Sequence, residues 1–137
     1  MNRIFVDTNI VIDLLAKRQE YESTAEIFSL GDRGELTIIV SSLSFSHLQY
    51  ILRKILKDKT LPALRDLELI VTIASVDEKV IKLALNDDEF RDFEDAIQYH
   101  SAIESESDII ITRNLKDFRK SKIPVMTSSQ FISSRIK

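Results

Sequence analysis

The chain has 137 residues, 44% of them hydrophobic, and a formal net charge of −3. We therefore expect residues 1–137 to form a single domain around one core. The absence of cysteine excludes disulfides, thiolate zinc sites and a cysteine nucleophile, and two histidines disfavour a histidine-rich zinc site. A divalent metal would be held mainly by carboxylates, whose hard oxygens favour Mg or Mn. A strongly basic nucleic-acid-binding surface is also absent in bulk, although net charge says nothing about local patches.

The first apolar run, Ile4 to Val6, is too short for a signal peptide. No stretch approaches the ~20 apolar residues of a membrane span. We therefore expect a cytoplasmic protein without membrane contact. With two glycines and two prolines in the chain, a glycine-rich phosphate loop is not expected either.

Short apolar runs alternate with helical patterns along the chain. Residues 4–6 predict a buried strand, followed by a helix over 10–17 with Thr8 or Asn9 as its cap. The clearest amphipathic helix is predicted at 42–57, where the apolar stripe is Leu48, Ile51, Leu52, Ile55 and Leu56. The other predicted elements are helices at 21–33, 61–69, 76–85, 93–103 and 128–136, and strands at 36–40, 70–74, 109–111 and 125–126.

This alternation of strands and helices predicts parallel βαβ units, with helices on both faces of one sheet. Sites in such folds form beyond the carboxyl ends of the strands. The residues that directly follow predicted strands are therefore the first candidates for chemistry.

Asp7 directly follows the first predicted strand. Taken alone, it is better explained as part of a helix cap than as a functional acid. Asp92 and Asp95 stand three residues apart near the start of a helix, which places both carboxylates on one face. They would flank an apolar stripe that runs from Phe93 to Ile103. Asp92 as the cap and Asp95 in the first turn would equally favour the helix dipole, so both interpretations stay open.

The residues after the strand at 109–111 form a second polar group. Thr112, Arg113 and Asn114 come directly after it, and Asp117 is the next acid. Asn114 and Asp117 offer oxygens to a metal, and the guanidinium of Arg113 is suited to a phosphate. A capped turn is the alternative, and local sequence favours it.

The two histidines lie on or beside apolar helix faces. His47 is next to the stripe of the helix at 42–57, and His100 lies within the stripe of its own helix. A histidine in this setting is more often a satisfied core residue than a ligand. The run from Asp87 to Glu89 is interpreted as a solvated acidic loop.

Four segments, taken in order, resemble a PIN domain, and together they span nearly the whole chain. They are Phe5-Val6-Asp7-Thr8-Asn9, Ser42 to Leu48, Asp92-Phe93-Glu94-Asp95-Ala96-Ile97-Gln98-Tyr99, and Ile111 to Phe118. Each motif is weak alone, whereas the ordered set is specific. The resemblance implies a three-layer α/β/α fold with a central parallel sheet of about five strands. It also implies an acidic pocket holding Mg or Mn and nuclease activity, usually on RNA. Many relatives are toxins of VapC type held inactive by an antitoxin, and dimers are common among them.

The resemblance carries over residue by residue. Asp7 matches the first acid of the family, Asp95 matches the acid that opens the late helix, and Asn114 and Asp117 bracket the variable fourth acid. The second acid, a Glu on the central helix, is replaced by His47. This departure resembles a PIN subgroup with a Ser-Phe-x-x-Leu pattern. Either another acid compensates, or metal binding is weak, or activity is lost.

Two hypotheses follow from the resemblance. In the first, the protein is an endoribonuclease that cleaves RNA with Mg or Mn. Asp7 and Asp95 bind the metal, Asp92 and Asp117 complete its shell, and a second set of residues orients ligands or substrate: Thr8, Asn9, His47, Thr112, Arg113 and Asn114. In the second, a PIN-like module has lost catalysis and binds RNA or protein. An antitoxin and a second copy of the chain are the expected protein partners.

Overall fold

Five parallel strands form the central sheet of the computed structural model, which describes residues 2–135. The strands are β1 (Arg3–Val6), β2 (Thr37–Ser41), β3 (Thr72–Ala74), β4 (Ile109–Ile111) and β5 (Val125–Met126). Their order is β3-β2-β1-β4-β5, so β1 is central, and Phe5 pairs with Ile39 on one side and Ile110 on the other. The predicted parallel sheet of about five strands is confirmed.

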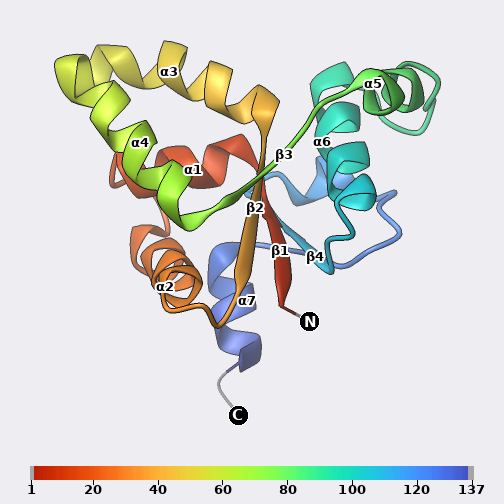
Figure 1. The fold of residues 1–137 in the computed structure, drawn as a ribbon. Helices are drawn as coiled ribbons and strands as arrows, with labels where there is room; N and C mark the ends of the chain where they lie inside the picture. The colour runs from red at the N-terminus through yellow and green to blue at the C-terminus, as the bar shows by residue number, and fades with distance from the viewer. Residues whose placement is uncertain (1, 136–137) are drawn as a thin grey trace.

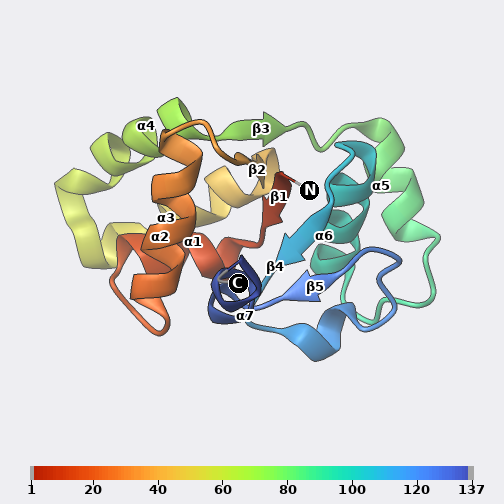
Figure 2. The same ribbon diagram turned by 90° about the horizontal axis from the view of Figure 1, so that it is seen from below.

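Helices cover both faces of this sheet (Figures 1 and 2). One face carries α1 (Thr8–Leu15), α2 (Tyr21–Asp32), α3 (Ser42–Leu56), α4 (Thr60–Ile70) and α7 (Ser128–Arg135). The other face carries α5 (Glu78–Leu85) and α6 (Phe93–Glu104). Two short 3-10 helices, η1 (Lys57–Lys59) and η2 (Leu115–Phe118), complete the set. The molecule therefore has the predicted three layers.

Strand alternation divides the buried side chains into two cores. Ile4 and Val6 of β1 pack with the α1–α4 and α7 layer, whereas Phe5 packs with α5 and α6. The buried side chains of β2 and β4 divide between the two cores in the same way, because successive side chains of a strand point to opposite faces. A sheet covered on both faces therefore requires strands whose central residues are apolar on both sides, as in β1, β2 and β4.

The differences from the predicted elements have local causes. The first helix begins at Thr8 and its N-cap is Asp7, not Thr8 or Asn9, because the Asp7 carboxylate accepts from the Thr8 N–H. β3 begins only at Thr72, since α4 extends to Ile70. The final helix is described to Arg135, and predicted position 136 lies outside the described residues.

Three predicted core residues are in fact exposed. On α3, Leu48 and Leu52 are fully buried, but Ile51 is 37% and Ile55 is 44% exposed. Only the side of α3 that packs on α1 and α4 is covered, so the buried stripe is narrower than the sequence pattern. Phe93 is 45% exposed at the first turn of α6, outside the stripe assigned to it.

Gly31 marks the closest approach of α2 to the sheet. A Cβ at this position would overlap Ile38 Cδ1 and lie 2.9 Å from Ile38 Cγ1, and Ile38 is 1% exposed. We expect Gly31→Ala to lower the free energy of unfolding by about 1–3 kcal/mol, since overpacking outweighs the better helix propensity of alanine. Chemical denaturation measures the change. Ile38→Val removes the overlapping atom, so it should rescue part of the loss, and strict additivity of the two changes would refute this explanation.

Candidate functional site

The carboxyl ends of the central strands bring the sequence-predicted residues to one edge of the sheet. Asp7 follows β1, Thr112 follows β4, and β2 ends at Ser41. Because β1 lies between β2 and β4, these three positions are neighbours. The Asp7 N–H donates to the Ile111 carbonyl at 2.9 Å, which fixes the chain at this edge.

The Asp7 carboxylate is 94% buried and is held entirely by hydrogen-bond donors. Oδ1 accepts from the Thr8 N–H at 2.8 Å and from Gln98 Nε2 at 3.1 Å. Oδ2 accepts from Thr112 Oγ1 at 2.8 Å and from Asn9 Nδ2 at 3.3 Å. An ionised carboxylate has about four acceptor positions, so these donors use its capacity fully. The predicted group of Asp7, Thr8, Asn9 and Thr112 is thus brought together by the fold.

Gln98 links this carboxylate to the central helix. Its side chain is buried, and its Oε1 accepts from Ser41 Oγ at 2.6 Å while Nε2 lies 3.0 Å from Ser44 Oγ. Ser44 Oγ is in turn 2.6 Å from Thr8 Oγ1. A neutral amide and hydroxyl network therefore fills the space between α3 and Asp7. Sequence analysis did not identify Gln98, Ser41 or Ser44 as site residues, although Gln98 and Ser44 lie within the quoted motifs.

Asp95 differs from Asp7 in having few donors. Within the described residues its carboxylate accepts no hydrogen bond, whereas its N–H donates to Asp92 Oδ1 at 3.0 Å. Asp92 is therefore the N-cap of α6, as the capping interpretation predicted. Burial, and then the nearby carboxylates of Asp92, Asp7, Asp117 and Glu94, raise the pKa of Asp95 to about 7. The acids that the sequence placed in one pocket do influence each other electrostatically.

Asp95 lies where two hollows meet. The first, of about 240 Å³, is lined by Asp7, Thr8, Asn9, Ile12, Leu43, His47, Ile51, Glu94, Asp95, Gln98 and Asn114. The second, of about 110 Å³, contains Asp92, Asp95 and Asp117. The predicted site residues are consequently divided: Asn114 belongs to the hollow with Asp7, and Asp117 to the hollow with Asp92.

Two predicted residues have partners that the sequence did not reveal. Arg113 Nε lies 2.9 Å from Oδ2 of Asp13, a fully buried acid on α1, and its N–H donates to Asn9 Oδ1. Burial raises the pKa of Asp13, against the opposing effect of the Arg113 guanidinium. Arg113 thus anchors the loop after β4 to α1. His47 lines the first hollow, and its Nε2 lies 3.7 Å from Oε2 of Glu94.

The second histidine is used structurally. His100 Nε2 lies 2.7 Å from Oδ2 of Asp87, and both side chains are mostly buried. The sequence suggested that Asp87 belongs to a solvated acidic loop, and this interpretation is wrong for Asp87. This hydrogen bond fixes the loop before α6 against that helix.

The donor set at Asp95 fits a hard divalent cation in its chemistry. Asp95, Asp92 and Asp117 supply carboxylate oxygens, and a cation would offset both the burial of Asp95 and the repulsion from its neighbouring carboxylates, the two causes that raise the pKa of Asp95. Among residues 2–135, however, no three acidic or histidine side chains are close enough to hold an ion together. This pattern fits an ion that retains several waters and takes one or two carboxylates, as Mg commonly does.

The raised pKa of Asp95 predicts a pH-dependent stability. The folded protein holds this proton more tightly than the unfolded chain, so the contribution is present below the ordinary pKa of 3.8 and is lost as the pH rises through about 7. We expect Asp95→Asn to raise the free energy of unfolding at about pH 8 by about 2 kcal/mol, a value discounted for the partial exposure of the carboxyl. Metal-free denaturation at several pH values tests this. The gain should vanish near pH 3. Asp66→Asn, an exposed change on α4, is the control, and a gain from Asp95→Asn that does not depend on pH would contradict the prediction.

Comparison with known proteins finds relatives that share the fold. The chain is 29% identical over 134 residues to Ribonuclease VapC1 of Aquifex aeolicus, with 94% of this chain and 92% of that protein covered. Its structure is similar to a chain of DNA-bound VapBC from Salmonella typhimurium (TM-score 0.71, 17% identity, covering 93% of this chain and 99% of that one). It is also similar to a chain of VapBC2 from Rickettsia felis bound to a promoter DNA fragment (TM-score 0.69, 20% identity, covering 90% and 96%).

The family assignment rests on the sequence itself. The family model described as "PIN domain" matches residues 3–116, a range that contains Asp7, α3 and Asp95 and ends just before Asp117. The chain therefore belongs to the PIN domain family.

Proposed function

We propose that this protein is a metal-dependent endoribonuclease that hydrolyses RNA phosphodiester bonds. The single observation that carries the proposal is the gathering of Asp7, Asp92, Asp95 and Asp117 around two adjoining surface hollows that share Asp95, where burial and then the neighbouring carboxylates raise the pKa of Asp95 to about 7. Perturbed acids in a surface hollow are typical of functional sites. Membership of the PIN family and the similarity to a ribonuclease support RNA as the substrate.

In this proposal each residue has a defined task. Asp95, with Asp92 and Asp117, holds Mg or Mn directly or through waters. When bound, such an ion acts as a Lewis acid and neutralises charge on the phosphate. Asp7 is fixed by its four hydrogen-bond donors and holds the segments that carry the other site residues in position. Asn114, which is exposed beside Asp95, positions the substrate.

Three of the residues first assigned to substrate or metal have narrower roles in the proposal. Thr112 and Asn9 orient Asp7 through Oδ2. Arg113 acts as a positioning residue, because Asp13 occupies its guanidinium.

A specific observation favours the alternative of a catalytically degenerate module. His47 stands where the family has a Glu, and the acceptor positions of Asp7 are already used. Such a protein would bind RNA or a protein partner without cleaving RNA. The two functions differ in one measurable property, which is Mg- or Mn-dependent hydrolysis.

The partners belong to the same proposal. Solved structures of similar fold include VapBC complexes, so we propose an antitoxin as a protein partner and a toxin role for this chain. A homodimer is a further possibility that solution mass measurement resolves. No helix within residues 2–135 is long and apolar enough to cross a membrane. We propose the cytoplasm, where RNA is accessible, as the location.

RNA cleavage is the direct test of the enzymatic proposal. The purified chain, freed of any antitoxin, should cleave single-stranded RNA with Mg or Mn and should stop when EDTA is added. Asp7→Asn and Asp95→Asn should each reduce the rate by at least about 10–100-fold, the loss typical of disturbed metal sites. Asp66→Asn, an exposed change of equal charge on α4, is the matched control. Cleavage that survives both site changes would refute the assignment of the site.

Metal binding can be measured without turnover. Because the metal binds the folded state, Mn in tenfold excess over its Kd should raise the melting temperature by about 4 °C or more. Asp95→Asn should abolish this rise, Asp7→Asn should reduce it because the site is then less well oriented, and Asp66→Asn should leave it intact. An unchanged melting temperature at about millimolar Mn would instead support the degenerate module.

A further inference from the structure

The smaller of the two hollows at Asp95 is charged along its whole rim. It lies between the start of α6 and the η2 segment, which pack together. Its lining contains four basic residues, Arg91, Lys116, Arg119 and Lys120, and four acidic ones, Glu89, Asp92, Asp95 and Asp117. The formal charges therefore balance, and any preference for a ligand must come from how the two sets are arranged.

The basic side chains of this rim are available to a ligand. All four residues are exposed, and none forms an ion pair within the described part of the chain. Their acidic neighbours have other surroundings: Asp92 caps α6, and Asp95 is crowded by carboxylates. The four cations therefore remain free to bind an anionic group whether or not the acids hold an ion.

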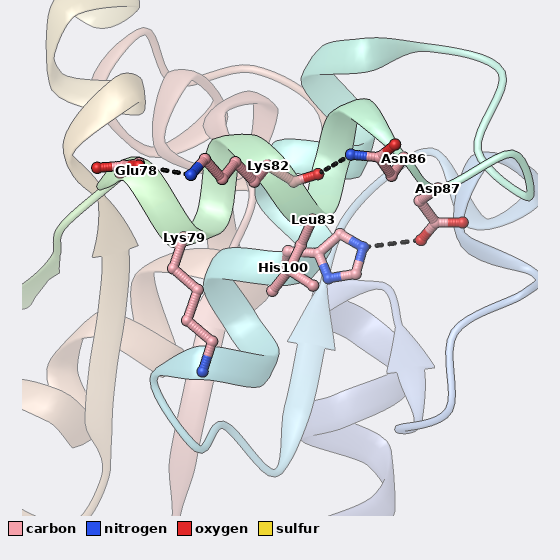
Figure 3. Close-up of a pocket in the computed structure, with 7 residues that line it drawn as sticks. All are labelled: Glu78, Lys79, Lys82, Leu83, Asn86, Asp87 and His100. Atoms are coloured by element: carbon pink, nitrogen blue, oxygen red, sulfur yellow. Dashed lines mark hydrogen bonds and ion pairs between the residues drawn. The ribbon is translucent and has the colours of Figure 1, made fainter.

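A larger hollow elsewhere on the molecule shows the contrast (Figure 3). It measures about 770 Å³ and lies on α5 and α6. Its charges are already paired: Lys82 with Glu78 at 2.6 Å, His100 with Asp87 at 2.7 Å, and Lys79 with Glu104 at 2.8 Å. This hollow, although larger, therefore offers no comparable set of free charged groups to a ligand.

The hollow on the other side of Asp95 has no basic residue except His47. Its walls combine three acidic side chains, Asp7, Glu94 and Asp95, with amides such as Asn114 and apolar side chains such as Leu43. Such a surface suits an uncharged sugar and base better than a phosphate. The two hollows thus differ in charge and share Asp95 as their common wall.

We propose that the rim formed by Arg91, Lys116, Arg119 and Lys120 binds the phosphodiester backbone of the RNA on one side of the scissile phosphate. The hollow at Asp7, whose acidic residues repel a phosphate, receives the nucleoside on the other side. This inference rests on the proposed function, and it identifies which face of the site holds the charged strand. Arg113, the sequence-predicted phosphate ligand, is not part of the rim because it is paired with Asp13.

The test compares two triple variants of equal charge change. Lys116→Gln, Arg119→Gln and Lys120→Gln together remove three rim cations. Lys54→Gln, Lys59→Gln and Arg65→Gln remove three exposed cations of α3, η1 and α4. Fluorescence anisotropy with labelled single-stranded RNA in EDTA, over a range of salt concentrations, measures binding without cleavage. Cleavage kinetics with Mn then give KM and kcat.

We expect the rim variant to bind RNA about tenfold or more weakly at low salt, and its salt dependence to be shallower by about 2 in log–log slope, or about 0.7 for each lost phosphate contact. Its KM should rise more than its kcat falls, while the control variant behaves as wild type. Circular dichroism checks that both are folded.

The outcomes separate this inference from the proposed function. A wild type that cleaves RNA, with equal salt slopes for both variants, would overturn the rim assignment alone. A wild type that binds RNA through the rim without cleaving it would support the rim and overturn the enzymatic proposal. A wild type that neither binds nor cleaves RNA would overturn both.

Discussion

The burial of the Asp7 carboxylate is the constraint on which this edge of the molecule depends. A carboxylate taken out of water is costly unless its oxygens are bonded, and no ion pair with a described residue serves Asp7. Its donors come from three places far apart in sequence, namely the start of α1, the end of β4 and the middle of α6. Satisfying one carboxylate therefore fixes the relative positions of the segments that carry the rest of the site.

The same constraint explains why two aspartates at one edge behave differently. Gln98 and Thr112 give their donors to Asp7, so Asp95 is left with carboxylate neighbours and partial burial. Environments that differ in this way are how proteins give distinct tasks to chemically identical groups. In the proposed function, Asp7 is a fixed structural centre and Asp95 is the acid with most to gain from a cation.

The local sequence pattern was sufficient to predict the fold, because the spacing of apolar residues in each strand and helix indicates which of its faces is buried. Ordered motifs were sufficient to bring Asp7, Asp95 and Asp117 to one edge. Neither source identifies partners across space: Gln98 resembles any polar residue on a helix, and nothing near Asp13 in sequence indicates the guanidinium of Arg113 100 positions later. Ile51 likewise follows the helical period but is exposed. The period indicates that one face of the helix is apolar, but it does not indicate how much of that face the neighbouring helices cover.

Net charge failed as a guide for a related reason. A value of −3 averages over the whole surface, whereas a nucleic acid meets one region of it. The segment from Lys116 to Lys122 holds four basic residues, and three of them line the hollow at Asp95. Arg113 attracted attention because it follows a strand directly, yet that position is where α1 comes close enough to bind it through Asp13. Lys116, Arg119 and Lys120 follow a few residues later and pair with no acid in the described chain, so they are the cations available to a phosphate in the proposed function.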